Sequence, residues 1–253
     1  GGQAMGAFIA RYDAERPSIE AWLDWGYAGE KCSRGLARSA RLTAQLENLY
    51  VVTNVLHSPE TRARLERALV CARRCGDAVG EANVLQARGD LKVREADLQG
   101  AREDYDAALP IYRDIQARLG EANVLKARGR LERALGNHEA SLDALQQALK
   151  IHSAIQAVLG VGGDFLEIGR TMLAAKQAAQ AVLFAECALE IYRDIGDRFG
   201  QCLALDDQGD ALYELQLAGP AFAAWWQALA LAQHIGLPSI AQRLTGIFDQ
   251  LRQ

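Results

Sequence analysis

Three groups of residues have the types needed for a catalytic, metal or phosphate site, but their spacing argues against each of these sites. Cys71 and Cys75 would share one face of a helix, yet a zinc site needs four converging ligands and the histidines are scattered. Asp206 and Asp207 are adjacent, so on a helix they point in different directions and form no catalytic carboxylate pair. The glycines of residues 160–163 follow a helical pattern, whereas a phosphate loop follows a strand. We therefore expect no enzyme, no metal and no cofactor.

The composition places these residues in a globular protein. Of 253 residues, 50% are hydrophobic and 24% are charged, and the formal net charge is −4. An acidic chain of this kind is not typical of a nucleic-acid or membrane-surface binder, and no apolar run is long enough to span a membrane. The 5 cysteines are odd in number and do not have the spacing of a disulfide framework, which favours the reducing cytoplasm.

An internal repeat organises most of the chain. The segment Gly80–Leu85 recurs as Gly120–Leu125, and the 40-residue offset continues beyond these two copies. An Ala-Leu pair follows the same period through five positions, which chance does not produce. Three sets of small residues recur at this 40-residue period. They are Gly80, Gly120, Gly160 and Gly200; Gly89, Gly129, Gly169 and Gly209; and Ala68, Ala108, Ala148, Ala188 and Ala228.

Each repeat is predicted to be a pair of helices, because apolar residues recur at helical spacing on both sides of a short polar break. One pair cannot bury its apolar face alone, so consecutive pairs must stack. We predict an N-terminal helical region at 1–37, a degenerate repeat at 38–80, four repeats at 81–240 and a capping helix at 241–253. Residues 1–4 precede a methionine, and a tag remnant is one interpretation of them.

The spacing of Leu85, Gly89, Ala101, Tyr105 and Ala108 resembles the signature of the tetratricopeptide repeat (TPR) family. The fourth repeat shows the same pattern at Leu205, Gly209, Ala221, Trp225 and Ala228. The family's usual period is about 34, with a proline near the end of each unit. The longer period here resembles the long-helix variant found in bacterial multidomain regulators and spindle-orientation scaffolds. The resemblance implies an all-α, right-handed superhelix, or solenoid, of TPR helix pairs.

The resemblance also implies a binding function. TPR arrays line a concave groove with the first helix of each repeat, so a protein or peptide segment is the expected partner, from another molecule or from the same one. We therefore expect a protein-binding scaffold. The alternative is a ligand-sensing arm of a larger signalling protein, with the glycines of residues 160–163 as a soft point where the next helix starts late. Residues 12–21 resemble the segment that opens TPR arrays in bacterial signalling ATPases.

The groove residues implied by the resemblance are first-helix positions that are not needed for packing. They are Asn83, Gln86, Asp90 and Arg94 in the first repeat; Asn123, Lys126, Arg130 and Arg133 in the second; Leu166, Glu167 and Arg170 in the third; and Asp206, Asp207, Asp210, Tyr213 and Glu214 in the fourth.

The charges of these positions differ between repeats, being basic in the second and acidic in the fourth. Arginines hold carboxylates through paired hydrogen bonds, and aspartates would meet a basic residue of the partner, so a partner of opposite polarity would fit. Two other interpretations stay open. The charges can form a solvated face without a ligand, or the fourth repeat of one copy can meet the second repeat of another copy.

Overall fold

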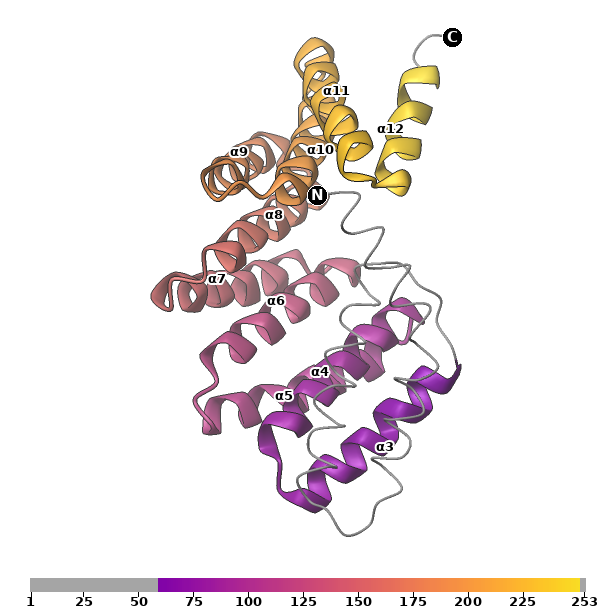
Figure 1. The fold of residues 1–253 in the computed structure, drawn as a ribbon. Helices are drawn as coiled ribbons and strands as arrows, with labels where there is room; N and C mark the ends of the chain where they lie inside the picture. Colours follow the sequence, from indigo (N-terminus) through magenta and orange to yellow (C-terminus); the bar gives the residue numbers. More distant parts are fainter. Residues whose placement is uncertain (1–58, 251–253) are drawn as a thin grey trace. The chain divides into compact units, whose positions relative to one another are not determined.

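The computed structural model describes residues 59–250, and these residues form α-helices joined by short turns. No strand occurs within that range, so the predicted all-α fold of helix pairs is confirmed. The predicted region 1–37, the first part of the degenerate repeat (38–58) and residues 251–253 lie outside the described residues. The helices are α3 Pro59–Cys75, α4 Ala78–Arg94, α5 Leu98–Asp114, α6 Arg118–Ala134, α7 His138–Ala154, α8 Val158–Ala174, α9 Ala178–Asp194, α10 Arg198–Glu214, α11 Ala218–Ile235 and α12 Pro238–Gln250 (Figure 1).

The period of 40 arises from helices of one length and turns of one kind. From α4 to α10 every helix has 17 residues, and a turn of three residues separates it from the next. The middle residue of each turn has a positive φ, and the residue after it donates its N–H to a carbonyl in the last turn of the preceding helix. This is the left-handed helix end that glycine favours. Glycine occupies it at Gly76, Gly136, Gly196 and Gly236, and other residues occupy it at Ala96, Gln116, Gln156, Lys176 and Gln216.

We expect opposite effects from exchanging residue types at two equivalent turns. Gly136 has a φ of 79° with open space around it, so Gly136→Ala should destabilise the protein by about 1 kcal/mol through backbone strain alone. Gln216 has a φ of 61°, and Gln216→Gly should stabilise the protein by about 0.5 kcal/mol, because relief of strain outweighs the added freedom of the unfolded chain. Urea denaturation of both variants checks the signs. A loss of stability in Gln216→Gly would contradict this account.

The described chain divides into two compact bodies, with the boundary inside α6 after Leu131. In the N-terminal body, α4 packs against both α3 and α5. In the C-terminal body, each helix from α7 to α12 packs against the next along the chain, and α8 also contacts α10. The first helices of successive repeats therefore lie side by side in the C-terminal body, which is the packing that stacks helix pairs.

Aromatic rings that lie against glycines set the close approach of the helices. The Tyr105 ring of α5 covers Gly89 of α4, and the Trp225 indole of α11 covers Gly209 of α10. A Cβ atom at either glycine would overlap the ring. Tyr105 and Trp225 are 1% and 3% exposed, so both rings belong to the core.

The glycine-rich start of α8 does not delay that helix. It begins at Val158 and has the same length as its neighbours, so the expected late start is wrong. Two of its glycines instead make room for rings. A Cβ at Gly160 would overlap the His152 imidazole, and one at Gly162 would press on the Tyr192 ring. The glycines therefore serve packing between helices.

A buried polar pair replaces apolar packing at one repeat junction. His152 Nδ1 lies 2.6 Å from Asp164 Oδ2, and both side chains are fully buried. In the 40-residue register His152 stands where other repeats have Tyr112 and Tyr192. The register places Asp164 where Val84, Val124 and Ala204 stand. Two residues that are unusual for their register positions thus pair with each other, through one imidazole nitrogen and one carboxylate oxygen.

Because the two residues depend on each other, their substitutions should not be additive. His152→Tyr or Asp164→Val alone leaves the other polar group buried without this partner, and each should destabilise by about 3 kcal/mol. The double variant has the residues of neighbouring repeats at both positions. Its free energy of unfolding should be close to that of the parent or higher. A double-mutant cycle by urea denaturation measures the coupling. Additive losses would show that the pair does not act as a unit.

Candidate functional site

Three predicted groove residues of α4 contact tyrosines of α5, the second helix of the same repeat. The Tyr112 hydroxyl lies 2.6 Å from Asn83 Oδ1 and 3.2 Å from Gln86 Oε1. The Tyr105 hydroxyl donates to Asp90 Oδ1 at 2.7 Å. These three polar groups of α4 therefore hold the helix pair together.

Arg130 of α6 approaches the same carboxylate, with Nη2 lying 3.8 Å from Asp90 Oδ1. Asn123 and Lys126 occupy the register positions of Asn83 and Gln86 on α6. The first helices of consecutive repeats are thus linked by charge within this body.

In the C-terminal body the predicted charges pair with one another. The buried Glu167 accepts from Arg133 at 2.9 Å and from Arg170 at 3.0 Å. Arg170 also donates from Nε to Asp207 at 2.8 Å. A chain of charge-assisted hydrogen bonds therefore runs from α8 to α10 across the faces of the first helices.

A cation of the last helix, Arg243, completes this arrangement. Arg243 of α12 binds Asp206 of α10 with one guanidinium nitrogen, and the other lies 3.3 Å from Asp210 Oδ2. Arg243 was not among the groove residues expected from the sequence. The 40-residue register would have found it, because Arg243 stands where Asn83 and Asn123 stand in the first two repeats.

Within each body, we call the first-helix faces that carry these residues its inner face. The charged residues of its pairs are Asp90 and Arg130 in the N-terminal body, and Arg133, Glu167, Arg170, Asp206, Asp207, Asp210 and Arg243 in the C-terminal body. Carboxylates and guanidiniums are nearly equal in number in this set. These contacts occupy the arginines expected to hold a partner's carboxylates, so they stabilise the packing of the chain itself.

At one position of the first helix, the residue type varies with the residue that faces it from the second helix of the same repeat. Asp90 accepts from Tyr105, and at the equivalent place Asp210 accepts from Trp225 Nε1 at 3.0 Å. The two middle repeats carry Arg130 and Arg170 instead, and their second helices have Leu145 and Ala185. An aspartate can accept from a ring donor and an arginine cannot, which explains the pairing of residue types.

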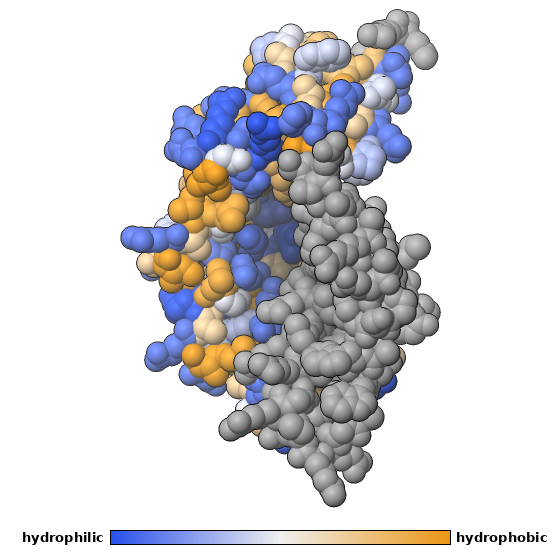
Figure 2. Space-filling view, in the orientation of Figure 1, coloured by the Kyte–Doolittle hydropathy of each residue, from blue (hydrophilic) through white to orange (hydrophobic). Residues whose placement is uncertain are grey.

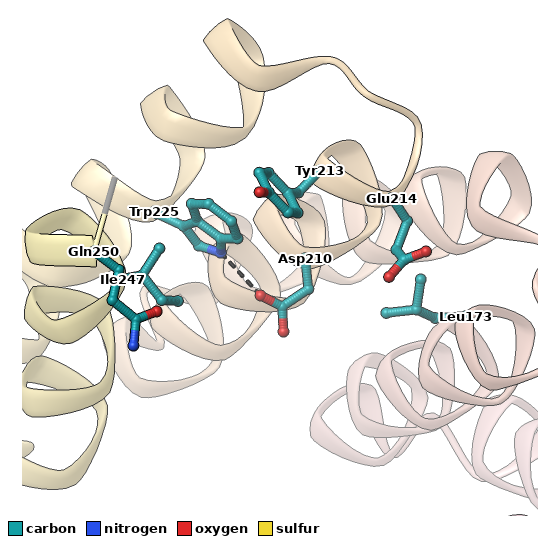
Figure 3. Close-up of a pocket in the computed structure, with 7 residues that line it drawn as sticks. All are labelled: Leu173, Asp210, Tyr213, Glu214, Trp225, Ile247 and Gln250. Carbon is teal, nitrogen blue, oxygen red and sulfur yellow. Dashed lines mark hydrogen bonds between the residues drawn. The ribbon is translucent and has the colours of Figure 1, made fainter. Parts of the chain in front are cut away.

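A pocket of about 390 Å³ opens on the inner face of the C-terminal body (Figure 3). We call it the α10 pocket. The two carboxylates of its lining, Asp210 and Glu214, are one helical turn apart on α10. A second pocket of about 360 Å³ shares Leu173 and Glu214 with it, so the hollow continues along this edge. The α10 pocket is lined by Leu173, Asp210, Tyr213, Glu214, Trp225, Ile247 and Gln250.

Three of these residues, Asp210, Tyr213 and Glu214, were predicted from the sequence as groove positions. The others come from helices that the prediction did not combine: α8, α11 and α12. Trp225 is both core and pocket wall, since its ring packs on Gly209 while its indole N–H reaches Asp210.

The aspartates beside the α10 pocket have altered acidities. Burial raises the pKa of Asp207 to about 7, although the neighbouring Arg170 guanidinium opposes that rise. Burial likewise raises the pKa of Asp206 above its usual range, with Arg243 acting in the opposite direction. A proton therefore binds more tightly to Asp207 in the folded chain than in the unfolded one.

We expect this proton to make stability depend on pH. A raised folded pKa contributes stability that is complete below about pH 4 and is lost as pH rises through about 7. The loss should reach at most roughly 1.4 kcal/mol per pH unit for this one proton. Asp207→Asn should remove this part of the decline between pH 5 and 8, and Asp194→Asn on the exposed end of α9 should leave it unchanged. Urea denaturation across this range tests the sign, and parallel curves for Asp207→Asn and the parent would contradict it.

Within residues 59–250, no group of three or more histidine, cysteine, aspartate or glutamate side chains is arranged to hold a metal ion. None of the helices in the same range combines the length and the apolar composition that a membrane-spanning segment needs. In the space-filling view, the visible part of this range shows hydrophilic and hydrophobic residues intermixed (Figure 2).

No known sequence family and no curated protein matches this sequence. Solved structures do match. BtubC from P. vanneervenii aligns with a TM-score of 0.73 at 14% identity, covering 89% of this chain and 92% of that one. A Rap protein complexed with competence and sporulation factor aligns with a TM-score of 0.61 at 16% identity, over 92% of this chain and 73% of that one.

A third match is a signal transduction ATPase with numerous domains from Pyrococcus horikoshii, which has a TPR sensor. It aligns with a TM-score of 0.64 at 16% identity over 96% of this chain, which corresponds to 42% of that protein. Together with the 40-residue helix pairs, these likenesses establish the fold. The chain has a helical-repeat fold of the tetratricopeptide type.

Proposed function

We propose that this chain is a protein-binding repeat domain that holds a partner segment on the inner face of α8, α10 and α12. The observation that carries the proposal is the α10 pocket, which opens where Asp210, Tyr213 and Glu214 were predicted to line a groove. The adjoining pocket along the same edge gives an extended segment a second place to bind. No step of this function requires chemistry from the chain.

The ion pairs of the inner face support this location. Glu167, Arg170 and Asp207 already satisfy one another, so a partner gains little by contacting them. The Tyr213 side chain is different, because it is 47% exposed and carries apolar area that a partner can cover. Aromatic side chains of this kind dominate the binding energy of many interfaces.

A second candidate function is a sensing arm within a larger signalling protein. The likeness to the ATPase with a TPR sensor favours it, since this chain matches less than half of that protein. In this form the partner segment binds the same face, and an effector domain outside this chain responds to it. The full reading frame in the source genome discriminates between the two, because the sensing arm requires an effector domain in the same protein or a dedicated partner.

The proposal predicts that a random peptide library displayed on phage yields peptides that depend on the α10 pocket. Tyr213→Ala should lower retention of the enriched peptides at least tenfold, because it removes an exposed ring from the pocket wall. Biolayer interferometry with the synthetic peptides measures the loss.

Phe199→Ala is the matched control, since Phe199 is a similarly exposed ring on the same helix but does not line the pocket. It should bind the peptides as the parent does. Equal binding by the parent and Tyr213→Ala, or a library without enriched peptides, would contradict the proposal.

A further inference from the structure

We propose that the α10 pocket recognises one basic side chain of the partner segment, and that it takes arginine in preference to lysine. This inference rests on the proposed binding function and names the chemistry of its anchor. Three features support it: the apolar walls of the pocket, the two carboxylates in its lining, and the weak pairing of those carboxylates with cations of the chain itself.

The walls suit a long aliphatic stem. Leu173 of α8 and Ile247 of α12 supply alkyl surface, and the Tyr213 and Trp225 rings stand together with centroids 5.4 Å apart (Figure 3). A volume of about 390 Å³ is at the small end for ligand pockets and fits one extended side chain. Arginine and lysine lay their stems along apolar surface while the charged head stays with polar groups.

The carboxylates supply the counter-charge. Asp210 and Glu214 are four residues apart on α10, so their like charges lie on one helix face and repel each other. The Trp225 indole N–H fixes the Asp210 carboxylate at 3.0 Å. A cation placed between the two carboxylates relieves their repulsion and also lies close to the aromatic rings, which attract it.

The cations already present leave this position open to a partner. Arg243 is held by Asp206, and its contacts with Asp210 are long, at 3.3 and 3.4 Å. Lys176 lies 3.9 Å from Glu214, with both side chains largely exposed, and such a surface pair contributes little. A partner's cation can therefore replace Lys176 at small cost.

The same features disfavour other anchors. An acidic or phosphorylated residue would meet two carboxylates, and an aliphatic residue would leave their charges facing apolar surface. Arginine has an advantage over lysine because its planar guanidinium can donate to two carboxylates at once.

The test uses peptides that differ only at one basic position. From the peptides enriched by the parent chain, versions are made with arginine, lysine or citrulline, the neutral isostere of arginine. We expect arginine to bind at least tenfold more tightly than citrulline, with lysine between them. Asp210→Asn/Glu214→Gln should abolish the difference, because it removes both charges while the introduced asparagine amide can still accept from Trp225. Glu190→Gln on the exposed face of α9 is the control and should keep it.

Free agmatine, a small guanidinium compound, is the second probe. Its binding is followed by the NMR signal of the Trp225 indole N–H, assigned with Trp225→Phe. Peptides that bind equally with arginine and citrulline would overturn the inference and leave the proposed function standing. Agmatine binding without any peptide binding would assign the pocket to small cations and overturn both. If neither the peptides nor agmatine bind, both the inference and the proposed function are overturned.

Discussion

The packing of aromatic rings against glycines is the contact on which the rest of this structure depends. Tyr105 on Gly89 and Trp225 on Gly209 bring the two helices of a repeat together closely enough for one ring to cross between them. The polar end of each ring then emerges on the inner face, where it meets Asp90 or Asp210. One contact therefore closes the core and also fixes the orientation of a carboxylate on the inner face.

The charged residues of the inner face have a structural role that their exposure alone would not suggest. Adjacent first helices present carboxylates and guanidiniums to each other, as Glu167, Arg170 and Asp207 do between α8 and α10. Such pairs are only partly exposed and joined in a network, so they stabilise more than isolated surface pairs do. They also leave the face nearly balanced in charge, which limits attraction of indiscriminate charged partners.

The α10 pocket lies where this internal pairing becomes weak. Glu214 makes a long, exposed contact with Lys176, and Asp210 shares Arg243 with Asp206. The same place combines alkyl surface from α8 and α12 with two aromatic rings. The proposed partner would gain most where the groups of the chain are only weakly paired with one another, and the pocket is such a place.

The 40-residue period and the helix pairs follow from the sequence alone, because small and large residues recur at fixed spacing and burial enforces that pattern. The groove positions predicted from the sequence include Asp210, Tyr213 and Glu214, which line the α10 pocket. The sequence could not determine which charges pair, since Arg243 reaches Asp206 from 37 positions away and only helix packing brings them together. For the same reason the glycines of α8 suggested a late start, whereas rings from α7 and α9 fill the space above them. Both the pairing of charges and the covering of a glycine by a ring involve side chains from different helices. They therefore depend on how the helices pack, which the spacing of residues along the chain does not specify.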